Sequence, residues 1–241
     1  MDEERSPGGS EIKRYEPRDR EIEPAHGDPD LIDGLTEHVQ RYLGQEPRVF
    51  HELVSDVVHV DVLHAAPTDE FPFNTLMTCG MSEHPMAAPE ELPEARHAEL
   101  MLRLPPEWPL EDEAFEDESA YWPVRLLKVL ARLPHEYDTW LWYGHTVPNG
   151  DPPEPYAPDT ELCGAILLTP VLGPDGFDRA DVAGRQISVL AVLPIHADEM
   201  DLKLERGAEE LAELFDDAEL SELVEPGRPS VVRRRRRLFR R

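Results

Sequence analysis

Hydrophobic and polar residues alternate along several parts of the chain with the period of a β-strand. The alternating segments in the first half are residues 55–68, 73–82 and 97–104. In the last of these, Leu100 and Leu102 share one face, and the two prolines that follow end the strand. Two hydrophobic runs in the second half, residues 161–170 and 186–195, predict buried strands.

Three other segments repeat their hydrophobic positions every three to four residues, which predicts amphipathic helices. The first starts near Asp30. The second covers residues 120–133, and Pro134 is expected to end it. The third is expected to be capped by Asp198 and extended by residues 216–223. The hydrophobic face of the second helix is expected to contain Trp122, Leu126, Leu127, Val129, Leu130 and Leu133.

The predicted order is a helix, three strands, a helix, three strands and a helix, with residues 138–144 as the fourth strand. Strands in runs, rather than alternating with helices, favour an α+β fold with a largely antiparallel sheet packed with helices, over residues 29–217. Residues 1–28 are charged and rich in proline and glycine, which predicts disorder. Residues 218–241 are expected to be an acidic helix extension and an arginine-rich tail, with 226–241 mobile and dispensable for folding.

Charge is distributed unevenly along this acidic chain, whose net charge is -27. Eight of the 24 basic residues are arginines after Glu225, so residues 1–227 carry 16 basic against 51 acidic residues, a balance of -35. A body this acidic repels a phosphate backbone and suits solubility or a basic protein partner, so we expect no nucleic-acid groove on it. The terminal arginine run fits a solvated tail, contact with nucleic acid or an anionic membrane surface, or docking onto the acidic body.

No hydrophobic run approaches the ~20 residues of a transmembrane helix. The N-terminus also lacks the hydrophobic stretch of a signal peptide. We therefore expect no membrane insertion and a cytoplasmic location.

Candidate catalytic and metal-binding residues are present but form no specific motif. His135 and Glu136 begin the zinc-binding pattern His-Glu-x-x-His, yet Thr139 stands where the second histidine is required. The other histidines share no fixed ligand spacing. Cys79 and Cys163 lie in hydrophobic runs, which indicates reduced core thiols. We therefore expect no catalytic residue, no metal and no cofactor, and a histidine-based metal-dependent hydrolase is the least favoured alternative.

Aromatic residues are concentrated in residues 138–144, where Trp140 and Trp142 would share one face of a strand. One interpretation is a core face of the sheet packed against a helix. The other is an aromatic recognition surface beside the loop of residues 144–150, because such rings are enriched at protein interfaces. On the second interpretation, the partner-binding residues are Trp140, Tyr143, His145 and Asn149.

Five segments in order, across roughly residues 45–217, resemble the Suppressor-of-fused (SUFU) domain family. They are HVDVLHAAPTDEFPFNTLMTCGMSEHPM, ELMLRLPPEWP, WPVRLLKVLARLPHEYDTWLWYGHTVPNG, YAPDTELCGAILLTPV and LAVLPIHADEMDLKLERGAEELAELFD. The resemblance implies a non-enzymatic α+β interaction domain, similar to the N-terminal half of a Hedgehog-pathway repressor. That repressor pairs this domain with a second one and holds a peptide of a Gli-type transcription factor between them by strand addition.

This chain departs from the animal pattern in two ways. It is too short for the second domain, and it lacks the acidic residue that animal members have between the equivalents of Gly144 and His145. Both departures speak against recognition of the same peptide. Bacterial members of the superfamily are proposed to be immunity proteins that neutralise toxins. The resemblance therefore implies sequestration of a protein partner such as a basic toxin, with a regulatory adaptor as the alternative, and it leaves the oligomeric state open.

Overall fold

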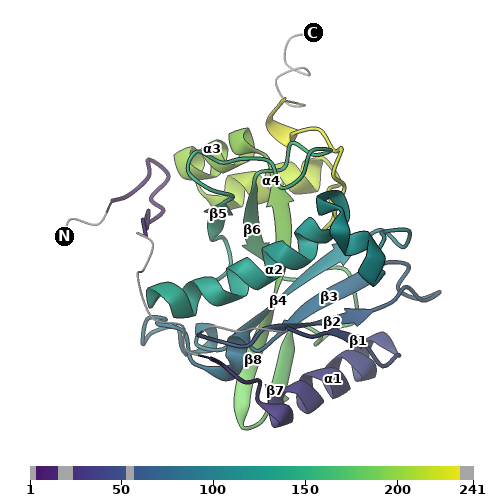
Figure 1. Cartoon of the computed structure of the whole chain (residues 1–241). Coiled ribbons are helices and arrows are strands. Elements are labelled where there is room, and N and C mark those ends of the chain that lie inside the picture. The colour runs from purple at the N-terminus through teal and green to yellow at the C-terminus, as the bar shows by residue number, and fades with distance from the viewer. Residues whose placement is uncertain (1–3, 16–23, 53–56, 234–241) are drawn as a thin grey trace.

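The fold is built on one mixed sheet of eight strands (Figure 1). The computed structural model describes residues 4–15, 24–52 and 57–233. The strands run in the order β1-β2-β3-β4-β8-β6-β5, and β7 pairs with β8 outside this path. Every pairing is antiparallel except that of β4 with β8, so the predicted α+β fold with a largely antiparallel sheet is confirmed. The strands are β1 (Arg48–Phe50), β2 (Asp61–Ala65), β3 (Asn74–Cys79), β4 (Ala98–Leu104), β5 (Thr146–Pro148), β6 (Gly164–Leu168), β7 (Arg179–Val182) and β8 (Arg185–Ile195).

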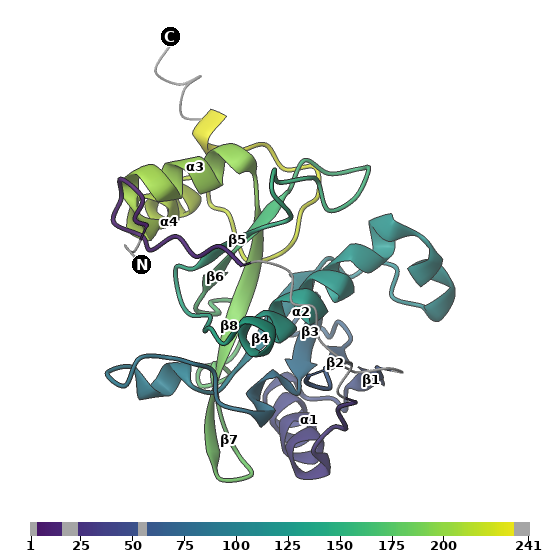
Figure 2. The same cartoon turned by 60° about the vertical axis from the view of Figure 1, so that its left-hand side comes forward.

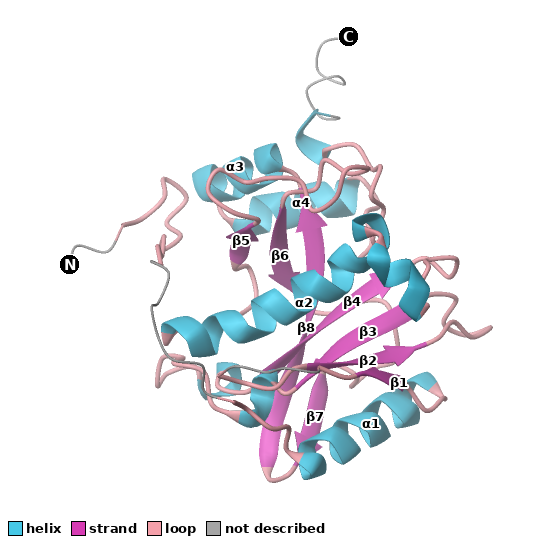
Figure 3. Ribbon diagram, viewed as in Figure 1, coloured by secondary structure: helices cyan, strands magenta, loops and turns pink. Residues whose placement is uncertain are grey.

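The helices cover both faces and one end of this sheet (Figure 3). They are α1 (Pro29–Leu43), α2 (Glu118–Tyr137), α3 (Ala197–Arg206) and α4 (Ala208–Asp217), with 3-10 turns η1 (Met81–Glu83), η2 (Pro93–Ala95) and η3 (Asp112–Glu116). Helix α2 packs on one face, α1 packs on the other, and α3 and α4 cover the end that holds β6. Figure 2 shows β8 running between the β7 hairpin and the α3 end of the molecule. Among the described helices, none combines the length and the hydropathy that crossing a bilayer requires.

Capping residues define both ends of helix α1. The Asp28 side chain caps it by accepting the N–H groups of Asp30 and Leu31 at 3.1 and 3.4 Å. Gly44 ends it in the left-handed conformation, with φ 78°. The helix predicted from Asp30 onward is therefore confirmed, with Leu31 and Leu35 fully buried on its inner face.

Helix α2 differs from its prediction at two positions. Pro134 does not end it; the helix continues to Tyr137. A proline in a helix lacks one N–H donor, and its ring crowds the carbonyl group four residues earlier. Pro134 is buried inside α2, so packing contacts offset these costs. Val129 is not on the buried face but is 53% exposed, because it lies about 200° around the helix from the fully buried Leu127.

Replacing Leu102 with alanine is expected to lower the free energy of unfolding by ~2–5 kcal/mol, because it removes a fully buried side chain between β4 and α2. The measurement is the midpoint of chemical denaturation. Val129→Ala is the matched control, since its loss of methyl groups at an exposed site should change stability by less than ~0.5 kcal/mol. Equal midpoints for the two variants would contradict the burial of this strand face.

The sheet contains three strands that hydrophobic alternation did not predict, namely β1, β5 and β7, each three or four residues long. In contrast, residues 138–144 are not a strand. Asp138 takes a left-handed conformation with φ 49°, so the chain turns there and becomes extended only at β5. Trp140 and Trp142 are both partly buried and pack against the same core as α2.

The last predicted helix is two helices, α3 and α4, that meet at Gly207. Its N-cap is His196 rather than Asp198, and the Glu199 carboxylate accepts the His196 N–H at 2.9 Å. The expected extension over residues 216–223 is also wrong, because α4 ends at Asp217. The chain beyond that residue runs beside β4 instead, where the Val224 N–H donates to Arg103 O at 2.9 Å.

The described parts of the N-terminal segment make contacts that the expected disorder does not account for. The Gly8 N–H donates to Leu204 O of α3 at 2.8 Å, and Tyr15 contacts the chain beyond α2. Residues 1–3 and 16–23 lie outside the described residues.

The C-terminal segment also packs on the body as far as Arg233, so the expected mobile tail is wrong for residues 226–233. Arg228 is buried, and so are Ser230 and Val231. Apolar contacts of Val231 and the buried ion pair of Arg228 with Glu199 hold this segment on the body. Residues 234–241, which carry most of the arginine run, lie outside the described residues.

Candidate partner-binding surface

The four residues expected to bind a partner follow α2 and lead into β5. Trp140 and His145 lie together, with ring centroids 4.6 Å apart in an edge-to-face arrangement. Tyr143 lies between them in the chain and is 45% exposed. Asn149 makes its contacts elsewhere, since its side-chain amide donates to Glu154 O at 2.7 Å and holds the loop after β5. The structure thus brings together Trp140 and His145, presents Tyr143 to solvent, and uses Asn149 to shape the adjoining loop.

The His145 ring is held by its neighbours in the chain. Its Nδ1 accepts the main-chain N–H of Trp142 at 3.2 Å, so the neutral ring carries its proton on Nε2. Burial lowers the pKa of His145 to about 4, and the charges of Lys203 and Lys13 add to this effect. The ring is therefore neutral at physiological pH and makes its edge-to-face contact with Trp140 as an uncharged imidazole.

The His145 ring is expected to remain neutral in the folded protein down to about pH 4. Unfolded histidine titrates near pH ~6.5, so the unfolded chain binds more protons between these two pH values. Stability supplied by the neutral ring is therefore lost as the pH falls through this window. Ring proton shifts in NMR spectra should stay constant from pH 8 to 5, and His145→Gln should reduce the loss of stability over that range. A ring that titrates at pH 6–7 would contradict its burial.

The N-terminal segment forms one border of the same surface. The Tyr15 hydroxyl lies 2.6 Å from the Thr139 hydroxyl oxygen, and the Tyr15 ring stacks on Tyr137 at 4.7 Å. Lys13 places its ammonium 5.9 Å from the centroid of the Trp140 ring, within cation–π range. Sequence reasoning missed these residues because composition assigned the whole segment to disorder. The segment contains one tyrosine among many charged residues, so it gave no periodic hydrophobic signal.

Strand β5 is one terminal strand of the sheet, and its free edge is limited. Leu167 N–H donates to His145 O at 3.0 Å, and Asn149 N–H donates to Cys163 O at 2.8 Å. The main-chain N–H and C=O groups of the odd-numbered residues therefore point toward β6. The outward main-chain groups then belong to Thr146 and Pro148. Proline has no N–H, so only Thr146 offers both a donor and an acceptor at this edge.

Elsewhere, the histidines considered as metal ligands are bonded to the protein itself. His135 Nε2 lies 2.8 Å from Met81 O, and His97 Nδ1 lies 2.9 Å from Ser82 O. His51 and His59 both contact the buried Asp61 carboxylate, at 3.1 and 2.9 Å. Within the part of the chain that the structure describes, no group of three or more histidine, cysteine, aspartate or glutamate side chains is placed to hold a metal ion.

Both cysteines are free and buried, as predicted. Burial raises the pKa of the Cys79 thiol, and the carboxylate of Glu99 raises it further. Burial also raises the pKa of Cys163. Both side chains are therefore thiols rather than reactive thiolates at neutral pH.

The fold and this surface define an α+β domain that presents an aromatic patch at the end of a mixed sheet. The chain belongs to the suppressor of fused protein (SUFU) family, whose family model matches residues 56–229. The match reaches beyond the expected domain end at residue 217 and includes the packed C-terminal segment up to Pro229. None of the curated protein sequences matches the chain.

Solved structures of the same family share this fold. A SUFU homolog from Neisseria gonorrhoeae superposes with a TM-score of 0.61 at 17% identity, over 84% of this chain and 97% of that one. A chain of the Sufu–Fu complex gives 0.60 at 14% identity, over 84% and 93%. Drosophila Suppressor of Fused gives 0.56 at 16% identity over 84% of this chain, which spans about half, 51%, of that protein's chain. At these identities the likeness shows the fold alone.

Proposed function

We propose that this chain is a non-catalytic binding protein that sequesters another protein at the surface around Trp140, Tyr143, His145 and Asn149. The observation that carries the proposal is the 45% exposure of Tyr143, which lies in the chain between Trp140 and His145, two residues whose rings contact each other just before the terminal strand β5. Tyrosine and tryptophan rings are enriched at the centres of protein interfaces. The Sufu–Fu complex supports a protein as the ligand, since a chain of the same fold there has a protein partner.

Charge favours a basic partner. The balance of -35 over residues 1–227 produces a negative potential that attracts a basic protein and repels nucleic acid. Toxins that attack nucleic acids carry basic surfaces, and an acidic inhibitor would cover the face that binds phosphate. We therefore place the chain among immunity proteins, which neutralise such a toxin by occupying it.

The histidine and cysteine side chains also favour binding over catalysis, because they are hydrogen-bonded to the main chain or protonated. The imidazoles of His135 and His97 are bonded to main-chain oxygens, and burial lowers the pKa of each. Burial keeps the Cys79 and Cys163 thiols protonated. A hydrolase would need at least one activated nucleophile or an open metal position.

A regulatory adaptor is the second candidate, and the N-terminal segment favours it. Lys13 and Tyr15 border the same surface through contacts that a competing ligand would disturb. An adaptor whose binding is controlled by its own N-terminus would show this arrangement. In that case the partner would be a signalling protein rather than a toxin.

Growth rescue tests the proposed function. Proteins encoded beside this gene are expressed one at a time, with and without this chain. We expect one of them to arrest growth alone and to be tolerated when the wild-type chain is present. Tyr143→Ala should lose most of the rescue, and Val171→Ala, which alters another exposed hydrophobic residue at 75% exposure, should keep it. A neighbour that binds without being toxic would favour the adaptor, and rescue that survives Tyr143→Ala would contradict the proposed surface.

A further inference from the structure

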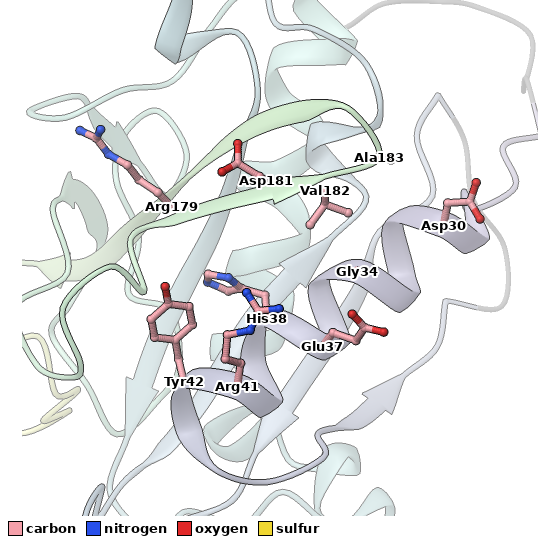
Figure 4. Close-up of a pocket in the computed structure, with 10 residues that line it drawn as sticks. All are labelled: Asp30, Gly34, Glu37, His38, Arg41, Tyr42, Arg179, Asp181, Val182 and Ala183. Carbon is pink, nitrogen blue, oxygen red and sulfur yellow. The ribbon is translucent and has the colours of Figure 1, made fainter.

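Strand β7 lies beside the end of β8 that is farther from β6 and β5, and its other edge is open (Figure 1). Among the described residues it pairs with β8 alone, through a hairpin whose two turn residues, Ala183 and Gly184, have φ values of 50° and 74°. A groove of about 270 Å³ separates this strand from the flank of α1 that carries Glu37 and Arg41. Figure 4 shows this groove running along β7, with Arg179 near one end and Val182 near the other.

The hydrogen bonds of β8 fix which main-chain groups of β7 point outward. Arg179 is opposite Ser188, and the Ser188 N–H donates away from β7, to His97 O at 3.0 Å. Arg179 is therefore a position that exchanges no hydrogen bonds with β8, and so is Asp181 two residues later. Among the described residues, none bonds to the N–H or C=O of Asp181 or to the C=O of Arg179.

The groove lies beside a close approach of α1 to β7 at Val182. Gly34 makes that approach possible, since a Cβ atom there would lie 2.3 Å from a methyl group of Val182. Ala180 and Val182 point toward α1 and are buried, whereas Arg179 and Asp181 point away and are exposed. The edge therefore presents free main-chain groups with two opposite charges beside them.

The sequence Arg179-Ala180-Asp181 is complementary to itself in the antiparallel direction. If two such strands pair about a twofold axis at Ala180, Arg179 of one lies opposite Asp181 of the other, twice. In this register each Asp181 N–H faces the Arg179 C=O of the other copy, so two hydrogen bonds form together with the two charge pairs; the Arg179 N–H is already used by Gly176 O at 3.4 Å. A twofold interface requires this kind of self-complementary surface.

We infer that the β7 edge is a self-association site, at which a second copy of this chain adds its own β7 as an antiparallel strand. The pairing joins two sheets through Arg179 and Asp181 and leaves β5 free at the far end of each copy. It goes beyond the proposed partner binding, because the two surfaces share no residue. Two chains of net charge -27 repel each other, so the association strengthens as salt screens that repulsion.

Charge exchange tests this inference on the full chain. Sedimentation velocity is measured over a range of concentrations at low and high salt. We expect the wild type to form a dimer, more strongly at high salt. Asp181→Arg and Arg179→Asp should each weaken it by ~10-fold or more, because two symmetric attractive pairs become repulsive. The double variant Arg179→Asp with Asp181→Arg restores opposite charges across the axis and should recover association to within ~3-fold of wild type.

A further variant separates the main-chain hydrogen bonds from the charges. Asp181→Pro removes the outward N–H without removing a bond to β8, and should abolish the dimer more completely than Asp181→Asn, which keeps that N–H. Thermal midpoints of all variants confirm that each is folded. A wild type that stays monomeric at every concentration, or a dimer that persists unchanged in Asp181→Arg, would overturn the inference. So would failure of the double exchange to restore association while both single variants weaken it.

Discussion

Replacing Arg228 with alanine is expected to lower the free energy of unfolding by ~3–5 kcal/mol, which is a large part of the stability of a domain. The Arg228 guanidinium pairs with both carboxylate oxygens of Glu199 at 2.7 and 2.6 Å. Their side chains are only 4% and 0% exposed. Removing the arginine would leave a buried carboxylate without its charge partner, and this uncompensated charge is the main cost.

The same ion pair links the C-terminal segment to the end of β8 and the start of α3. Glu199 also accepts the N–H of Val231 at 2.9 Å and that of His196 at 2.9 Å, and Arg228 donates to Pro194 O at 3.0 Å. Burial by itself would raise the pKa of Glu199, but the hydrogen bond and the charge of Arg228 lower it below its ordinary value. The stability from this lowered pKa is present above pH ~4.5 and is lost as the pH falls through the folded pKa.

Equilibrium denaturation at pH 7 measures the effect. Arg233→Ala is the matched control, because Arg233 pairs with Glu161 and Asp198 at the surface with 64% of its side chain exposed. An exposed pair of this kind contributes about 0–1 kcal/mol. If Arg228→Ala lowers the free energy of unfolding no more than Arg233→Ala does, the buried ion pair does not hold the C-terminal segment on the body. A chain that ends at Glu225 should lose at least as much stability as Arg228→Ala.

Hydrophobic periodicity predicted the elements that are long enough to repeat their apolar positions several times, whether one face is buried, as in α1, or both faces are, as in β4. Strand β4 and helix α1 were found because their inner residues repeat over seven and fifteen positions. Strands β1, β5 and β7 were missed because three or four residues are too few to show a period. Pro134 was misjudged for a different reason: proline penalises a helix locally, but buried contacts around α2 outweigh that penalty.

The sequence predicted those contacts of the candidate surface that join residues close together in the chain, and missed the contacts that join distant segments. Trp140 and His145 lie close in sequence, so their proximity followed from the local turn. Tyr15 reaches Thr139 from 124 residues away, and no pattern in the sequence indicates that contact. Glu199 and Arg228 each looked like ordinary surface charges in an acidic helix and a basic tail. Their pairing depends on the position of the whole C-terminal segment.

Association with a basic partner is expected to slow by ~10- to 10³-fold when salt rises from low to well above physiological concentration. The reason is the balance of -35 over residues 1–227, whose field extends over a Debye length of ~8 Å at physiological salt and is screened beyond it. Surface plasmon resonance with the captured partner measures this on-rate directly. An on-rate that does not change with salt would show that the acidity contributes only to solubility.

The off-rate in the same experiment locates the contact. Tyr143→Ala removes a ring that is 45% exposed and should raise the off-rate by ~10- to 30-fold if the ring is an anchor of the interface. Its on-rate should stay near that of wild type, because the total charge is unchanged. Val171→Ala is the control, since it shortens a residue that is 75% exposed in the loop between β6 and β7. If Tyr143→Ala dissociates as slowly as Val171→Ala, the partner binds somewhere other than the surface around Trp140 and His145. A salt-dependent on-rate together with a fast off-rate for Tyr143→Ala alone would establish both the steering and the site.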